Sequence, residues 1–146
     1  MPDATRRILV CCLGLIAALW AVGAVAAEPL RHFVQSLPIW AGVALGARKS
    51  ALSKWVALPL FAFWLFLMGC IWLFLLGWAR IVSGAFSPAE IALTVAIGAV
   101  CLAGIVSCLR FKTTTRAPAA IMAVVLSAAL QCGALAASLM PAIARR

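Results

Sequence analysis

Acidic side chains are nearly absent from this sequence. Its 146 residues include three acids, Asp3, Glu28 and Glu90, and a single histidine, His32. Catalysis usually needs carboxylates, histidines or a nucleophile with a base beside it, but these four residues are scattered among the terminus and the loops. No acid, lysine or arginine lies deep in an apolar run, where a proton-coupled carrier places one. We therefore expect no catalytic residues; a membrane enzyme would require Glu28 and His32 to converge on a pocket.

Patterns that bind metals or cofactors are missing as well. The chain has no CxxC pair and no Cys/His spacing suited to zinc. A haem or chlorophyll would need an axial ligand, and the aromatic stretch 55–79 has no histidine. The sequence therefore predicts no metal site and no cofactor. All six cysteines fall in apolar runs, where a thiol behaves as a small hydrophobic group: Cys11, Cys12, Cys70, Cys101, Cys108 and Cys132.

Polar residues are too few to cover a soluble globule. Hydrophobic residues make up 67% of the chain and the mean hydropathy is +1.19, so lipid is the expected solvent. Twelve lysines and arginines against three acids give a net charge of +9, and these cations stand at the ends of apolar runs. Because no aromatic residues interleave with them outside those runs, we expect the bilayer and its anionic lipid head groups as their partners, and no nucleic acid.

The uncharged stretch 55–79 has twenty-five residues, more than the about 20 that cross a hydrocarbon core as a helix. Trp55 and Trp78 lie near its two ends, where indole rings favour the membrane interfaces. Lys54 and Arg80 stand just outside them and can extend their charges into water. We therefore expect these four residues to anchor a membrane span at its two interfaces.

Proline placement divides this region in two. A proline has no N–H to donate, so Pro59 fits the first turn of a helix better than its interior. The segment 48–58 is rich in residues that suit the head-group layer, and we expect it to form a short interfacial helix before a span at 59–78.

The predicted fold is an all-α integral membrane protein, a single domain of residues 1–146 with five transmembrane helices, the second of them short. The first span follows a basic pair and is longer than a usual signal core, which favours a retained anchor over a cleaved signal. The predicted spans are about 8–27, 33–47, 59–78, 88–109 and 118–141.

The stretch 33–47 is ambiguous because fifteen residues are short for a crossing. If it crosses and the N-terminus is cytoplasmic, eight cations lie inside and four outside, which satisfies the positive-inside rule. If it does not cross, that rule favours four spans with the N-terminus outside, at seven to five. We expect the crossing, in a bacterial inner membrane with a cytoplasmic N-terminus.

Two local signals concern helix ends and helix packing. Ser87, Pro88 and Glu90 have the spacing of an N-cap, a first helical residue and the partner of a capping box. A cation or proton site at Glu90 is the less favoured alternative. Near the centre of the last span, Gln131 is expected to make an interhelical hydrogen bond rather than to line a polar path.

Small residues recur at spacings of three and four on three of the predicted spans, and such faces let helices associate in lipid. With no chemistry apparent, we expect a protein without catalytic activity that acts through helix packing, as an accessory or assembly subunit of a membrane complex or as a homo-oligomer. The alternative is a small transporter or channel for a neutral or weakly polar solute, lined by Gln131, Thr94 and Ser127.

Overall fold

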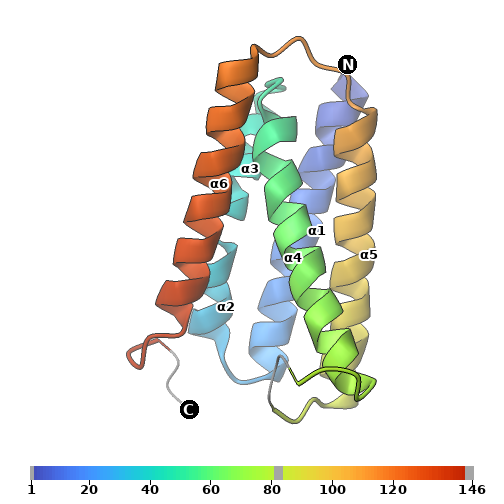
Figure 1. The fold of residues 1–146 in the computed structure, drawn as a ribbon, viewed down its shortest axis with the longest axis vertical. Coiled ribbons are helices and arrows are strands. Elements are labelled where there is room, and N and C mark those ends of the chain that lie inside the picture. Colours follow the sequence, from blue (N-terminus) through green and yellow to red (C-terminus); the bar gives the residue numbers. More distant parts are fainter. Residues whose placement is uncertain (1, 81–83, 144–146) are drawn as a thin grey trace.

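The structure, a computed structural model that describes residues 2–80 and 84–143, is an up-and-down helical bundle (Figure 1). Within these residues there are six helices and no strand. Four of the helices, α1, α4, α5 and α6, are long and apolar enough to cross a membrane. The helices are α1 Pro2–Val25, α2 Pro29–Ser36, α3 Ile39–Ala47, α4 Ser53–Leu75, α5 Pro88–Arg110 and α6 Ala117–Ser138.

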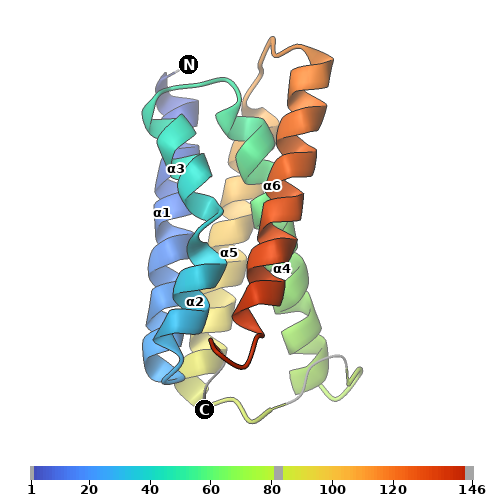
Figure 2. The same cartoon turned by 90° about the vertical axis from the view of Figure 1, so that its left-hand side faces the viewer.

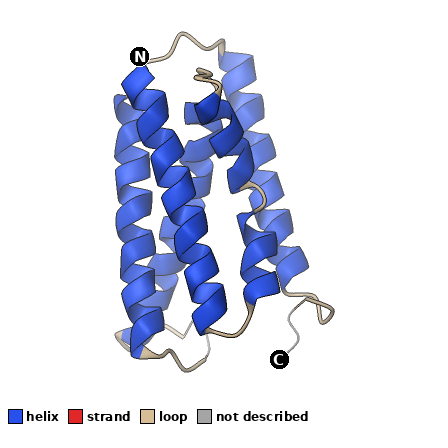
Figure 3. Ribbon diagram, turned by 180° about the vertical axis from the view of Figure 1, so that it is seen from behind, coloured by secondary structure: helices blue, strands red, loops and turns tan. Residues whose placement is uncertain are grey.

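The expected count of five spans is not confirmed, and the four-helix alternative fits the helix lengths better, because the stretch 33–47 is not one continuous helix. It is divided between α2 and α3, which meet at a break near Pro38 (Figure 3). Pro38 has no N–H to donate to the carbonyl of Val34. The N–H of Leu37 donates to that carbonyl at 3.2 Å instead, so α2 ends there and the chain starts a new helix.

The two short helices nevertheless carry the chain along the length of the bundle. They follow one another beside α1, from the end at which α1 stops to the end at which it starts (Figures 1 and 2). As a result α4 begins at the same end of the bundle as α1, and these two helices run in the same direction. We call the end that holds the start of α1 the basic end, and the opposite end the cavity end.

The prediction of a separate interfacial helix over 48–58 is wrong. Residues 48–52 form turns, and α4 already starts at Ser53, so that Pro59 lies inside this helix. The reason lies at the end of α3, where Lys49 adopts a left-handed φ of 53°. The N–H of Ser50 donates to the carbonyl of Leu45 at 3.0 Å, which closes a Schellman turn and reverses the chain.

Bulky side chains of α4 pack into a small-residue face of α5. Phe61 is fully buried against Gly104, where an added Cβ would lie 2.5 Å from Cε2 of the ring. The ring of Trp72 covers Gly98 in the same way, and its Nε1 donates to Oγ1 of Thr94 at 3.0 Å. Packing within the chain therefore accounts for Phe61 and Trp72, whereas Phe66 of the same helix is 68% exposed.

A second close approach joins α3 to α1 through glycines four residues apart. A Cβ on Gly42 would lie 3.0 Å from Sγ of Cys12, and one on Gly46 would lie 3.1 Å from Cβ of Leu9. This is the small-xxx-small pattern of helix pairs in lipid. The sequence reasoning placed small faces on α1, α5 and α6 and missed this one on α3.

Candidate functional site

A cavity of about 760 Å³ opens at the cavity end of the bundle. Its walls come from the last turns of α1, from α2, from the middle and second half of α4, and from the start of α5 with the preceding loop residues 84–87. The walls differ in character. The side formed by α1, α4 and α5 includes Leu19, Trp64, Met68 and Ile97, each at most 4% exposed, whereas the side formed by α2 is polar.

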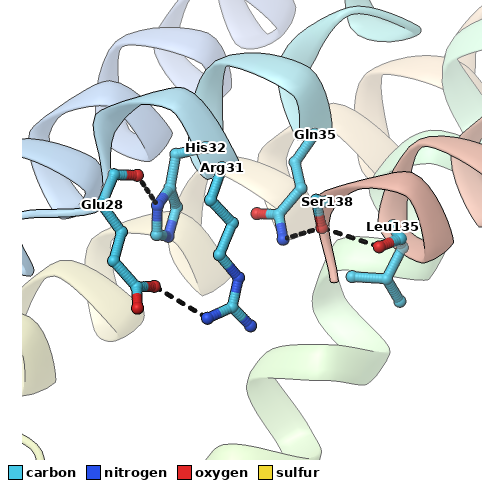
Figure 4. A network of polar contacts seen from close by, with 6 residues as sticks. All are labelled: Glu28, Arg31, His32, Gln35, Leu135 and Ser138. Atoms are coloured by element: carbon cyan, nitrogen blue, oxygen red, sulfur yellow. Dashed lines mark hydrogen bonds and ion pairs between the residues drawn. The ribbon is translucent and has the colours of Figure 1, made fainter. Parts of the chain in front are cut away.

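The polar wall is one face of α2 and the residue before it. Glu28, Arg31, His32 and Gln35 are spaced three and four residues apart, so a helix brings them to one side. Figure 4 shows that the carboxylate of Glu28, the guanidinium of Arg31 and the amide of Gln35 extend to the same side of the helix. This stretch therefore lines the cavity with groups that can orient a bound molecule.

An ion pair and an oriented imidazole form the outer half of this wall. Nη1 of Arg31 donates to Oε2 of Glu28 at 2.7 Å. Nδ1 of His32 lies 3.1 Å from the backbone carbonyl of Glu28. A carbonyl can only accept, so Nδ1 carries the proton and Nε2 of the neutral ring is an acceptor. Burial, the largest cause, lowers the pKa of His32, which keeps the ring neutral at pH 7.

The inner half of the polar wall is tied to α6. Nε2 of Gln35 donates to Oγ of Ser138 at 2.9 Å, and that hydroxyl donates to the carbonyl of Leu135 at 2.7 Å (Figure 4). Nε2 of Gln131 donates to the backbone carbonyl of Gln35 at 3.1 Å, while Oε1 of Gln131 is buried without a partner. We call these contacts the α2–α6 seam. They satisfy polar groups beside the helix break, where carbonyls lose their helical partners.

The capping box borders the same cavity. Oγ of Ser87 accepts from the N–H of Glu90 at 3.3 Å, and the N–H of Ser87 donates to Oε2 of Glu90 at 2.7 Å. Pro88 is the first residue of α5. Both Ser87 and Glu90 line the cavity, so the carboxylate at the start of α5 also contributes a negative charge to the site.

The four anchor residues lie at opposite ends of α4. Nζ of Lys54 donates to the carbonyl of Phe111 at 2.9 Å and stands 4.8 Å from the ring centre of Trp55, at the basic end. Trp78 and Arg80 follow the end of α4 and are exposed, Trp78 at 79%. Lys54 therefore holds the C-terminus of α5 in addition to any contact with head groups.

Sequence reasoning missed the cavity, although it had one signal for it. Glu28, Arg31, His32 and Gln35 repeat at the helical period within a short stretch, and this pattern marks a polar helix face. Nothing in the sequence indicated the apolar wall on the other side, because apolar residues of this kind occur throughout membrane-spanning helices. In the described part of the chain, no group of His, Cys, Asp and Glu residues could hold a metal ion.

Comparisons of the chain with protein-family models, with curated proteins and with solved structures find no match. A function must therefore be argued from the geometry of the cavity and of the bundle around it.

Proposed function

We propose that this protein is a small membrane carrier that accepts a small, weakly polar solute in its cavity. The observation that carries the proposal is the contrast between the two walls. One wall is apolar, from α1, α4 and α5, and the other is the polar face of α2. Ligand sites combine a mostly apolar lining with a few convergent polar groups in a space of about 300–1,000 Å³. A volume of about 760 Å³ falls within that range.

The helix break supports a carrier over a static binding protein. Discontinuous helices mark substrate sites in many transporters, because unwound backbone and helix ends face the solute. Here α2 ends at Ser36, and the preceding residue, Gln35, lines the cavity. The short helix α2 contacts α6 through the α2–α6 seam. It also contacts α1, where Nε1 of Trp20 donates to Oγ of Ser36 at 3.1 Å. It takes no part in the packing of α4 on α5, so a movement of α2 would leave that packing in place.

Orientation follows from charge. Eight cations and one acid lie at the basic end: Arg6, Arg7, Arg48, Lys49, Lys54, Arg110, Lys112, Arg116 and Asp3. Among the described residues, the cavity end holds two cations and two acids: Arg31, Arg80, Glu28 and Glu90. The positive-inside rule then places the basic end and the N-terminus in the cytoplasm of a bacterial inner membrane. In this proposal the stretch 33–47 crosses as a broken element, and the cavity opens to the outer side.

Association with a membrane-protein partner or with a second copy stays a prediction. Its motive was the set of small-residue faces, and those on α5 are covered by Phe61 and Trp72 of the same chain. Blue-native electrophoresis from mild detergent is the test. A stable monomer without a co-purifying protein would count against a subunit role and would leave the carrier proposal intact.

Accessibility of an introduced thiol tests the carrier proposal directly. Val22 lines the cavity, whereas Val95 lies outside it on α5 and is 57% exposed on the lipid-facing surface. In intact cells, we expect Val22→Cys to react with a membrane-impermeant methanethiosulfonate and Val95→Cys to stay unreactive, with the unmodified chain as the baseline for its six native cysteines. If Val22→Cys reacted only after the membrane had been permeabilised, the cavity would open to the cytoplasm, opposite to the orientation proposed here. A folded Val22→Cys variant that never reacts would overturn the proposal.

A further inference from the structure

The polar wall of the cavity offers hydrogen-bond acceptors on two neighbouring turns of α2. Nε2 of neutral His32 is an acceptor because Nδ1 carries the proton. The amide nitrogen of Gln35 is engaged by Ser138, and its oxygen points to the side on which Arg31 and His32 lie (Figure 4). Two acceptors from neighbouring turns of α2 therefore border the same space.

Part of the guanidinium of Arg31, the charged donor of this wall, is engaged or enclosed. Nη1 of Arg31 is bonded to the carboxylate of Glu28 at 2.7 Å. Nε of Arg31 is buried, so a molecule in the cavity cannot reach it. The ion pair places a positive and a negative charge side by side, which leaves little net field from these two residues.

The charged residues that line the cavity favour a bound cation. The cavity is lined by one cation, Arg31, and two carboxylates, Glu28 and Glu90. His32 adds no charge at pH 7, because its burial disfavours the protonated ring. The lining therefore carries a net negative charge, and the rings of Trp64 and Phe86 at the apolar wall have faces that attract cations.

From these observations, and resting on the proposed carrier function, we infer that the solute carries a protonated amine on an apolar body. The ammonium donates to Nε2 of His32 and Oε1 of Gln35 near the carboxylates of Glu28 and Glu90, and the apolar body lies against α4. A carboxylate or phosphate on the same body would meet two acceptors and a lining in which two carboxylates outnumber one cation, Arg31.

Three probes with one apolar body test this inference: 2-(1-naphthyl)ethylamine, 2-(1-naphthyl)ethanol and 1-naphthaleneacetate. Each is titrated at pH 7.5 against the full chain in lipid nanodiscs, with empty nanodiscs subtracted. We expect the amine to bind at least tenfold more tightly than the acetate, with the alcohol between them. If no probe binds above empty discs, the carrier proposal fails. If the acetate binds as well as the amine or better, the carrier proposal stands and the amine inference falls.

Two variants separate charge from structure. Glu90→Gln keeps a residue that can complete a capping box and removes one negative charge, so it should weaken the amine several-fold and leave the alcohol unchanged. Equal losses for both probes would indicate a structural effect and would contradict the inference. Val95→Phe, a substitution on the lipid-facing side of α5, is the control and should change neither affinity.

The pH dependence of affinity is a further test, because a purely structural role of His32 would not produce it. Below the lowered pKa of His32 the ring is protonated, and Nε2 changes from an acceptor to a donor. Amine affinity should therefore be full at pH 7.5 and fall as the pH drops through that pKa, while acetate affinity rises. Arg31, Glu28 and Glu90 are the charged groups that act on the ring. His32→Phe should abolish this change on acidification from pH 7.5. If that variant kept the profile of the unmodified chain, His32 would not be part of the site.

Discussion

The α4–α5 interface and the α2–α6 seam are built in opposite ways. Between α4 and α5, rings fill the space over glycines, as with Phe61 on Gly104, so the contact depends on shape. Between α2 and α6, side-chain amides and a hydroxyl provide the contact, and one acceptor of Gln131 has no partner. In lipid, burying apolar surface between helices gives no gain over contact with acyl chains. Close packing therefore fixes the first interface, while the second can open by exchanging a few hydrogen bonds.

Breaking the packed interface should have the largest effect. A methyl group at position 104 would lie 2.5–2.7 Å from three carbons of the Phe61 ring, which is fully buried and cannot move aside. We expect Gly104→Ala to destabilise the bundle by about 1–3 kcal/mol, the usual cost of overpacking. The measurement is the midpoint of unfolding by SDS titration in mixed micelles.

Gly133 gives a matched control for this change. It lies inside α6, and no atom lies within 4 Å of a Cβ built there. Alanine is about 0.5–1 kcal/mol better than glycine inside a helix, so Gly133→Ala should leave the bundle unchanged or slightly more stable. If both alanines had the same effect, close packing would not distinguish the α4–α5 interface.

Breaking the α2–α6 seam should lower the free energy of unfolding less than Gly104→Ala does, but it should make α2 more mobile. Gln131→Leu removes the donor to the carbonyl of Gln35, and an interhelical hydrogen bond in a membrane is worth about 0.6–2 kcal/mol. Because the unpartnered oxygen of Gln131 is lost as well, we expect about 1 kcal/mol, with faster amide hydrogen exchange confined to residues 29–36. Ser127→Ala is the control, since its hydroxyl donates only within α6. Unchanged exchange in α2 would show that the seam does not hold it.

The two interfaces also differ in how far the sequence predicts them. Length and hydropathy were enough to find the four long helices, and the Ser87–Glu90 spacing predicted where α5 begins. These features depend on residues close together in the chain. The sequence showed the bulky residues of α4 and the small-residue face of α5. It did not show that these two helices pack against each other, because that depends on the topology of the bundle. Sequence periodicity does not report topology.

The polar seam and the cavity were hidden for a different reason. Gln131 was expected to form an interhelical bond, yet its partner is a backbone carbonyl, and a carbonyl has no sequence signature. That carbonyl needs a partner because α2 ends at Ser36, before Pro38, whereas hydropathy predicts a span as far as residue 47. A single proline thus divides an expected membrane span into two short helices, and the first of them carries the polar wall that suggests a function.

The smallest expected loss of stability comes from a change at one end of α5, a helix that side chains hold at both ends. The start of α5 has a capping box and its end is bonded by Lys54, whereas α2 has no side-chain cap at its start. Lys54→Met removes the bond from Nζ to the carbonyl of Phe111, a cation placed where the helix dipole favours one. We expect a loss of about 0.5 kcal/mol, the low end for a net hydrogen bond, with faster exchange at the last turn of α5. Lys112→Met, at an exposed neighbouring position, should have no such effect. Equal losses in the two variants would mean that charge at the basic end matters and the specific bond does not.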